Sequence, residues 1–344
     1  MDINNVIEYL KGYDGPDITL MEVCGTHTAS IAENAIPSLL SPKIHLVTGP
    51  GCPVCVTVSQ YIDTLCRLAL EGNTIVTFGD LIRVPGSTKA LKDIKSEGAD
   101  IRMVYSPMDT IELAKAEPKK SFVFAAVGFE TTTPIYAILL DEIIKQDITN
   151  IKLLTALKTM PNVIDALCRR DNAVDGFLAP GHVAVITGSN AFDNLAKKYG
   201  LPFVVSGFEA EEILASIYAL VRLKNKGVVM NLYKSVVHDS KNEKAADLVN
   251  KYFMPYDAAW RGLGIIDDSG IVLRPEYARY DAGSKDITQD YSYSKGCMCG
   301  DVISGLKSPC DCKLFGTACT PENPKGACMV SGEGCCFNYY SNRG

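Results

Sequence analysis

Cysteines dominate the residues of this chain that could do chemistry. The 344-residue sequence has thirteen of them, and eight fall in the C-terminal tail. The tail cysteines are Cys297, Cys299, Cys310, Cys312, Cys319, Cys328, Cys335 and Cys336. The N-terminus has neither a basic region nor an apolar stretch of signal-peptide type, so we expect a cytoplasmic protein. In a reducing compartment, cysteines serve as metal ligands, redox thiols or nucleophiles more often than as a disulfide framework.

The spacing of the tail cysteines is irregular, and the tail contains no histidine. Dispersed cysteines that supply only thiolate ligands favour an iron–sulfur cluster. A zinc ion bound by four cysteines is the structural alternative, and redox disulfides are a third possibility. A tail rich in Gly and Pro needs such a centre to hold it together, because it lacks the material for a large core.

A separate cysteine pair lies in the segment Gly-Pro-Gly-Cys-Pro-Val-Cys at 49–55. The segment follows a predicted strand and precedes a predicted helix, which would place Cys52 near a helix N-terminus. The helix dipole at that position favours the thiolate. Cys52 and Cys55 are therefore a candidate redox pair or soft-metal site, with a structural half-site as the alternative.

Cys24 stands in the segment Cys-Gly-Thr-His-Thr at 24–28, directly after another predicted strand. We interpret it as a thiolate ligand or as a nucleophile that His27 assists. The alternative is a small buried side chain, which is a common fate of a single cysteine. Cys66 and Cys168 fall in helical patterns and are assigned to the core or the surface.

Short apolar runs that end at Gly or Pro alternate with helical patterns from about residue 19 to 225. Such runs are typical of parallel strands that are buried on both faces. The predicted strands are 18–23, 44–48, 74–78, 122–127, 176–179 and 203–205, and the clearest helical patterns are 58–70 and 209–222. The alternation predicts an α/β fold with a largely parallel sheet.

Three pairs of segments recur in the same order along the chain. Residues 23–31 resemble 127–135, residues 48–56 resemble 178–186, and residues 76–80 resemble 204–208. We interpret them as two similar α/β domains whose strand-end loops line one cleft, where ligands bind in such folds. The predicted domains are 1–118, 119–225 and a smaller C-terminal iron–sulfur domain at 226–344.

The composition excludes several classes of function. Apolar residues make up 47% of the chain and charged residues 22%, an ordinary globular balance. The net charge of −6 argues against a nucleic-acid binder that relies on a basic face. No apolar run approaches the length of a membrane span, so we expect no membrane segment.

The motifs, taken together, resemble the HypD family of hydrogenase maturation factors. The resemblance rests on the segments at 24–28 and 49–55 and on four others in the same order. These are Gly-Phe-Glu-Thr-Thr at 128–132, Pro-Gly-His-Val at 180–183, Trp-Arg-Gly-Leu-Gly at 260–264 and Cys-Thr-Pro-Glu-Asn-Pro-x-Gly-Ala-Cys-Met-Val-Ser at 319–331. The match runs from about residue 20 to the C-terminus.

This resemblance implies two similar Rossmann-like α/β domains and a third domain that carries a [4Fe–4S] cluster. It also implies a scaffold function, together with the small partner HypC, in which iron acquires two cyanides and one carbon monoxide. The cyanide would come from the HypE–HypF pair, and the transient Fe(CN)2CO unit would pass to the large subunit of [NiFe]-hydrogenase. Such a protein is an assembly scaffold with redox activity.

The resemblance also carries roles over to individual residues. Cys24, with His27 beside it, corresponds to the family's iron-scaffold cysteine, and Cys52 and Cys55 correspond to its Cys-Pro-x-Cys pair. The family's cluster ligands map onto Cys312, Cys319, Cys328 and Cys336. Cys310 and Cys335 look like additional thiols, whereas Cys297 and Cys299 match the family pattern without an assigned role.

Two rival functions share some of these features. An iron–sulfur-dependent thiol–disulfide oxidoreductase would use the cluster and the Cys52–Cys55 pair but would not need Cys24 or His27. A scaffold without redox activity could bind zinc in its tail. A cluster protein purified without oxygen is brown and a zinc protein is colourless, so colour separates the zinc scaffold from the other two.

Overall fold

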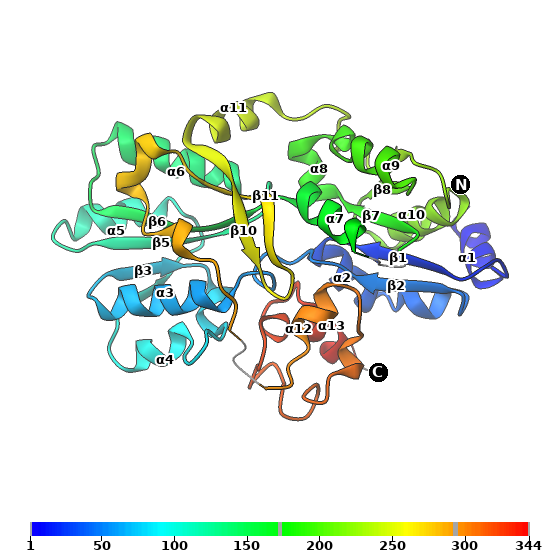
Figure 1. Ribbon diagram of the computed structural model, residues 1–344, viewed down its shortest axis with the longest axis horizontal. Helices are drawn as coiled ribbons and strands as arrows, with labels where there is room; N and C mark the ends of the chain where they lie inside the picture. The colour runs from blue at the N-terminus through cyan, green and yellow to red at the C-terminus, as the bar shows by residue number, and fades with distance from the viewer. Residues whose placement is uncertain (1, 171–173, 292–294, 343–344) are drawn as a thin grey trace.

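Two β-sheets form the framework of the computed structural model, which describes residues 2–170, 174–291 and 295–342 (Figure 1). Sheet A has the strand order β2-β1-β7-β8-β9, and all of its neighbouring strands pair in parallel. Its strands are β1 (Ile18–Glu22), β2 (Ile44–Thr48), β7 (Gly176–Pro180), β8 (Phe203–Ser206) and β9 (Val229–Asn231).

Sheet B has the strand order β10-β11-β6-β5-β3-β4. Strands β3 to β6 pair in parallel, and the antiparallel hairpin β10–β11 is added at β6. The strands are β3 (Thr74–Thr77), β4 (Ile101–Met103), β5 (Phe122–Gly128), β6 (Ile151–Lys158), β10 (Phe253–Trp260) and β11 (Gly264–Leu273). The prediction of an α/β fold is confirmed, because all six predicted strands are present.

Neither sheet is built from one continuous stretch of chain. The chain forms β1 and β2 of sheet A, then β3 to β6 of sheet B, then β7 to β9 of sheet A, and finally β10 and β11 of sheet B. The predicted boundaries at residues 118 and 225 therefore do not separate the two sheets, which corrects the sequence prediction. Local periodicity shows that a segment is a strand, but it carries no information about the sheet that the strand joins.

The two sheets share a strand order. In sheet A, the four neighbouring strands β2-β1-β7-β8 are the second, first, third and fourth strands of that sheet along the chain. In sheet B, taken from its β4 edge, the strands β4-β3-β5-β6 follow the same order. Strand β1 therefore corresponds to β3, and β7 corresponds to β5. The similar segments 23–31 and 127–135 follow β1 and β5, so they do not occupy equivalent places. They resemble each other because tight turns with Gly and Pro end many buried parallel strands.

Both faces of sheet A are covered by helices. Alternate residues of β1 face opposite layers, since Leu20 packs with one buried cluster and Met21 with the other. One layer contains α1 (Ile3–Lys11), α2 (Gly25–Glu33), η1 (Ile36–Leu39) and α10 (Ala210–Arg222). The other contains α7 (Met160–Arg169), α8 (Gly181–Thr187), η3 (Ser189–Phe192) and α9 (Asp193–Tyr199).

Sheet B is also covered on both faces. One layer contains α3 (Ser59–Leu70) and α4 (Leu91–Ser96), with η2 (Gly79–Arg83) beside them. The other contains α5 (Asp109–Ala116), α6 (Thr133–Lys145), α11 (Glu243–Tyr252) and η4 (Pro275–Tyr280). The element η5 (Ser284–Asp286) follows η4. Continuous apolar strands such as β5, buried along its whole length, are what such a three-layer arrangement requires.

The cysteine-rich tail forms a small unit that lies between the two sheets, below the β10–β11 hairpin in Figure 1. Its elements are α12 (Cys299–Ile303), η6 (Pro309–Asp311), η7 (Ala327–Met329) and α13 (Cys335–Ser341). The predicted C-terminal domain at 226–344 begins too early, because β9 joins sheet A and β10–β11 joins sheet B. None of the helices in the described part of the chain is long and apolar enough to cross a bilayer.

Candidate functional site

Cys24 lies just beyond the carboxyl end of β1, the first strand of sheet A. Strand β1 has β2 on one side and β7 on the other, so the chain order reverses at β1. Ligands of open α/β sheets bind in the crevice at such a reversal point, because the loops that follow the two strands diverge there. Cys24 precedes α2 as its N-terminal capping residue. The predicted location of Cys24 after a strand is confirmed.

The loop after β2 is in direct backbone contact with Cys24. The N–H of Gly25 donates to the carbonyl of Gly51 at 3.0 Å. A Cβ atom at Gly51 would lie 2.2 Å from the backbone nitrogen of Cys24, which is far inside van der Waals contact. Only glycine allows this approach, so Gly51 fixes the loop that carries Cys52 and Cys55 against the Cys24 turn.

The Cys24 side chain is buried, with 7% of its surface exposed. Burial raises the pKa of its thiol to about 12, although the backbone N–H groups of His27 and Thr26 act in the opposite direction. The thiol is therefore protonated in the protein alone. A soft metal cation that binds the sulfur would have to displace this proton, as metal binding to cysteine generally does.

Glu22 is a site residue that the sequence analysis missed. Its carboxyl group accepts hydrogen bonds from the Cys24 N–H at 2.9 Å and from the Thr28 hydroxyl at 2.6 Å. Burial raises the pKa of Glu22 to about 7, in spite of these hydrogen bonds. An acidic residue at the end of an apolar strand is the signal that could have identified it.

The tail reaches Cys24 through Glu333, which the sequence analysis also missed. A Cβ atom at Gly25 would lie 2.4 Å from Cβ of Glu333, so the two residues are packed against each other. The Glu333 N–H donates to the Ser331 hydroxyl, which in turn donates to Asp80 at 3.3 Å. Asp80 follows β3, the counterpart of β1, so this short segment connects the reversal points of the two sheets.

His27 is fully buried, and its ring is directed toward the end of β8. Its Nε2 lies 2.9 Å from the carbonyl of Gly207, and because a carbonyl only accepts, Nε2 carries the proton. Nδ1 has no hydrogen-bond partner among the described residues. Burial lowers the pKa of His27 to about 4, so the ring is neutral at pH 7. The His182 ring stacks on Phe208 and the His27 ring packs against the same ring at a tilt, which brings the motifs at 24–28 and 180–183 together.

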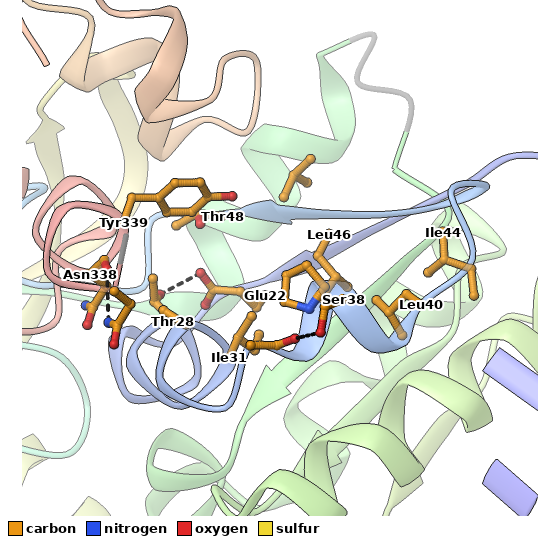
Figure 2. Close-up of a pocket in the computed structure, with 15 residues that line it drawn as sticks. Glu22, Thr28, Ile31, Ser38, Leu40, Ile44, Leu46, Thr48, Asn338 and Tyr339 are labelled. Carbon is orange, nitrogen blue, oxygen red and sulfur yellow. Dashed lines mark hydrogen bonds between the residues drawn. The ribbon is translucent and has the colours of Figure 1, made fainter. Parts of the chain in front are cut away.

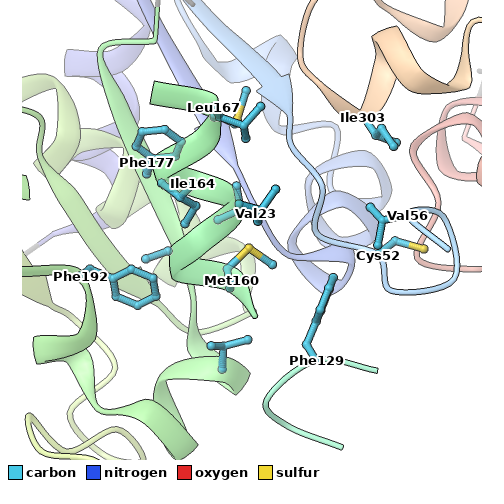
Figure 3. Close-up of a cluster of buried hydrophobic side chains, with 14 of the residues drawn as sticks. Val23, Cys52, Val56, Phe129, Met160, Ile164, Leu167, Phe177, Phe192 and Ile303 are labelled. Atoms are coloured by element: carbon cyan, nitrogen blue, oxygen red, sulfur yellow. The ribbon is translucent and has the colours of Figure 1, made fainter. Parts of the chain in front are cut away.

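Cys52 and Cys55 form a disulfide in this structure, with a Cα–Cα distance of 5.2 Å. The Cys55 N–H donates to the Cys52 sulfur, and the pair belongs to a buried cluster with Val23 and Phe129 (Figure 3). The predicted helix N-terminus at Cys52 is wrong, because α3 begins only at Ser59. A turn lies between the pair and the helix, so any thiolate here is stabilised by local N–H groups rather than by the α3 dipole.

Six tail cysteines surround one small cavity of about 10 Å³. They are Cys297, Cys299, Cys312, Cys319, Cys328 and Cys336, and apolar side chains such as those of Met298, Leu314 and Phe315 complete the walls. The two remaining tail cysteines lie outside. Cys335 accepts a hydrogen bond from the Thr48 hydroxyl at 3.1 Å, and Cys310 is exposed.

The donor set of this cavity fits a thiolate-held cluster. It contains only thiols, its walls are apolar, and the Lys325 N–H donates to the Cys319 sulfur at 3.3 Å, a contact of the kind that tunes iron–sulfur centres. Cys299 and Cys328 share a thiol–thiol hydrogen bond. Within the described ranges, no three His, Cys, Asp or Glu side chains converge on a position for a single metal ion. The four predicted cluster ligands line the same cavity as Cys297 and Cys299.

A pocket of about 420 Å³ opens beside Glu22 (Figure 2). Apolar side chains from α2, η1 and β2 form most of its wall, and Tyr339 of α13 lies at one end. Among its described lining residues, Glu22 supplies the only carboxyl group. The pocket therefore lies next to the Glu22 carboxyl group, which accepts the hydrogen bond from the Cys24 N–H.

Glu130, in the motif at 128–132, joins the two sheets. Its Oε1 accepts a hydrogen bond at 2.8 Å from the N–H of Met160, the first residue of α7, which packs on sheet A. Its Oε2 has no hydrogen-bond partner among the described residues. Burial raises the pKa of Glu130 to about 7.

Comparisons with known proteins relate the chain to proteins of hydrogenase formation. A family model named HypD and described as "Hydrogenase formation hypA family" matches residues 2–343. A putative hydrogenase expression/formation protein of Methanocaldococcus jannaschii is 40% identical over 330 residues, which cover 95% of this chain and 92% of the relative. Hydrogenase maturation factors HypD of Cupriavidus necator and Escherichia coli are each 39% identical and cover 95% of this chain, and 90% and 89% of the relatives.

The fold, the cysteine motifs and these matches first define a class, the proteins of hydrogenase formation. The family model spans nearly the whole chain, and the relatives are matched over almost their full length. The chain therefore belongs to the HypD family of hydrogenase maturation factors.

Replacing Gly51 tests the backbone contact at Cys24. We expect Gly51→Ala to reduce the free energy of unfolding in urea by about 1–3 kcal/mol, because the new Cβ collides with backbone that cannot move aside. Gly332→Ala is the matched control, since a Cβ there meets no atom within 4 Å. Equal effects of the two substitutions would show that the contact is not tight.

Glu130 should make stability depend on pH. The pKa of Glu130 in the folded protein, about 7, lies above the ordinary value of 4.5. Its contribution to the free energy of unfolding is therefore complete below pH 4.5 and is lost as the pH rises through 7. Glu130→Gln does not titrate. Relative to wild type, its unfolding free energy should rise by about 3 kcal/mol between pH 4.5 and about pH 8.

Urea unfolding at a series of pH values measures this difference. Glu8→Gln is the matched control for the loss of one carboxyl group, because Glu8 is exposed on α1. A constant difference between Glu130→Gln and wild type at all pH values would contradict the expected titration.

Proposed function

We propose that this protein is the scaffold on which, together with the small partner HypC, iron acquires its cyanide and carbon monoxide ligands for [NiFe]-hydrogenase. The observation that carries the proposal is the convergence of three segments on the Cys24–Gly25 turn. The turn after β1, the loop of the Cys52–Cys55 pair and the tail at Glu333 all meet at Cys24. The Fe(CN)2CO unit is the cargo of this site rather than a resident cofactor.

Cys24 would supply a thiolate ligand to that iron, with a second thiolate from HypC. Thiolates suit low-spin iron that carries cyanide and carbon monoxide, because both metal and ligands are soft. The buried position of Cys24 keeps water away from a reactive intermediate. Glu22 holds the Cys24 backbone and, with a pKa near 7, can give up or take a proton when the thiol loses its own.

His27 is proposed to assist as a neutral imidazole. Its protonated Nε2 is bound to Gly207, so only the Nδ1 lone pair is open to a proton or to a hydrogen-bond donor. A direct hydrogen bond from His27 to a bound cyanide would require this Nε2 contact to break.

The tail is proposed to hold a [4Fe–4S] cluster with Cys312, Cys319, Cys328 and Cys336. When bound, such a cluster supplies single electrons at low potential. Cys52 and Cys55 would exchange two electrons between their disulfide and dithiol forms. Cyanide would arrive from HypE, which HypF serves upstream, and the whole assembly is proposed to work in the cytoplasm.

Infrared spectroscopy of the anaerobically purified complex with HypC tests the scaffold function. We expect bands of iron-bound cyanide and carbon monoxide in wild type and their loss in Cys24→Ser, because a hard, protonated hydroxyl replaces a soft ligand. Cys168→Ser, in α7, is the control and should keep the bands. A Cys24→Ser complex with bands of normal intensity would remove Cys24 from the mechanism.

Visible absorption of the anaerobic protein tests the cluster ligands. Cys312→Ala, Cys319→Ala, Cys328→Ala and Cys336→Ala should each bleach the protein, whereas Cys310→Ala and Cys335→Ala should not. Cys297→Ala is the decisive comparison, because Cys297 lines the same cavity and Cys328 is engaged with Cys299. If Cys297→Ala bleaches the protein and Cys328→Ala does not, Cys297 rather than Cys328 would be the cluster ligand. A colourless protein that contains zinc would reject the cluster.

A thiol–disulfide oxidoreductase is the second candidate function, and the Cys52–Cys55 disulfide favours it. Such an enzyme would reduce a protein disulfide without Cys24. Two results together would support this alternative. Cys24→Ser would keep the reductase activity, and the wild-type complex with HypC would show no cyanide bands.

A further inference from the structure

Arg261 holds the segment that follows the Cys52–Cys55 pair. It lies in the turn between β10 and β11, in the motif at 260–264. Its backbone N–H donates to the Val56 carbonyl at 2.9 Å, and its Nε donates to the Thr57 carbonyl at 2.8 Å. Val56 in turn donates its N–H to the Cys52 carbonyl. The guanidinium group is therefore fastened to the dithiol loop within two residues of Cys55.

The same turn is packed against the cysteine-rich tail on its other side. Gly262 has φ +72°, and a Cβ atom there would lie 2.2 Å from Cα of Gly300 in α12. Ile303, also of α12, belongs to the same buried cluster as Cys52 and Val56 (Figure 3). Arg261 thus lies between the dithiol loop and the wall of the cysteine cavity.

The charge of Arg261 is poorly compensated in this state of the protein. Its side chain is 8% exposed, and its Nη2 is buried without a hydrogen-bond partner among the described residues. The nearest carboxylate, Asp290, is 4.0 Å from Nε and also accepts the Ser59 N–H. Because this ion pair is long and leaves Nη2 without a partner, the buried charge is only partly compensated, and a nearer anion in another state of the protein would be favoured.

Lys158 and Cys299 are two other titratable groups near the turn that carries Arg261. Lys158 lies 5.1 Å from the Trp260 ring, and burial lowers its pKa to about 7. The hydrogen bond with Cys328 and burial raise the pKa of Cys299 well above its ordinary value, and the Arg261 charge acts against both. None of these groups supplies a resident anion in contact with Nη2.

We propose that Arg261 is the counter-charge for the thiolate that forms when the Cys52–Cys55 disulfide is reduced, and that it thereby sets how readily this pair is reduced. The inference rests on the redox role proposed for the pair, but not on any role in iron chemistry. Arg261 acts as a positioning and electrostatic residue and does not itself react.

The reaction in question is exchange with a small dithiol reductant. The Cys52–Cys55 sulfur–sulfur bond breaks, and the reductant forms its own cyclic disulfide and supplies two electrons. Of the two protons released by the reductant, one goes to a protein sulfur and one to solvent. The product is a thiol and a thiolate, and the thiolate is the anion that Arg261 would stabilise.

Equilibration of the anaerobic full-length protein with dithiothreitol buffers tests the proposal. After acid quench and alkylation, mass spectrometry of the Cys52–Cys55 peptide gives the exchange constant. We expect Arg261→Met and Arg261→Gln to make reduction about tenfold less favourable, equivalent to about 30 mV for this two-electron couple. Arg261→Lys, which keeps the charge, should stay near wild type. Arg170→Met is the control, because Arg170 binds the Leu263 carbonyl of the same turn.

The sign of the change separates this role from a purely structural one. If Arg261 only orders the loop, its loss lowers the effective concentration of the two thiols, and reduction becomes easier in both neutral variants. That result, or no change, would overturn the proposal. The pH dependence gives a second test. The exchange constant should rise with pH once the thiolate forms, and we expect this rise to begin at a higher pH in Arg261→Gln than in wild type.

The measurement uses the full-length protein without the Fe(CN)2CO cargo and without HypC. A shifted exchange constant in a protein that never assembles Fe(CN)2CO would keep the inference and reject the proposed scaffold function. If Arg261→Met fails to fold, the comparison of Arg261→Gln with Arg261→Lys decides the question in the same way.

Discussion

The site depends on a backbone contact that leaves no room for a side chain. The loop after β2 lies against the Cys24 turn so closely that Gly51 must lack a Cβ. This contact follows from the topology, because β1 and β2 are parallel neighbours and their carboxyl ends meet at one edge of sheet A. Once the two loops are joined, the positions of Cys24 and of the Cys52–Cys55 pair are no longer independent. The tail then covers both.

Burial controls the charge of the site more than any local ion pair does. Glu22 and Glu130 have pKa values raised to about 7, His27 has one lowered to about 4, and the Cys24 thiol titrates only near pH 12. Each of these shifts favours the neutral form. The site therefore carries less charge than its residue types suggest, and an incoming metal cation would change the protonation of several groups together. Arg261 is the exception, since a guanidinium keeps its charge when buried.

The sequence was a good guide to elements and a poor guide to their assembly. Apolar runs such as 122–127 identify buried strands because full burial on both faces leaves no alternation, and the structure contains every strand predicted on that basis. Sheet membership could not be predicted, since β1 pairs with β7 across a stretch of chain that builds most of sheet B. The hairpin β10–β11 was missed because its burial pattern is irregular and a bulge interrupts its register. Cys24, Cys52 and Cys55 were found from their neighbours in sequence, whereas Glu333 was not, because only folding brings it to Gly25.

The interleaved path of the chain also decides when the thiols become protected during synthesis. The hydrogen bond from Thr19 to Asp175 spans 156 residues, and β1 gains its second neighbour only when β7 has left the ribosome. Contacts so distant in sequence form late, because the loop between them must close first. Glu333 and the cysteine cavity come later still, because residues 297–336 follow β7 along the chain. The nascent chain therefore carries Cys24, Cys52 and Cys55 in the open until the tail has been made and closes over them.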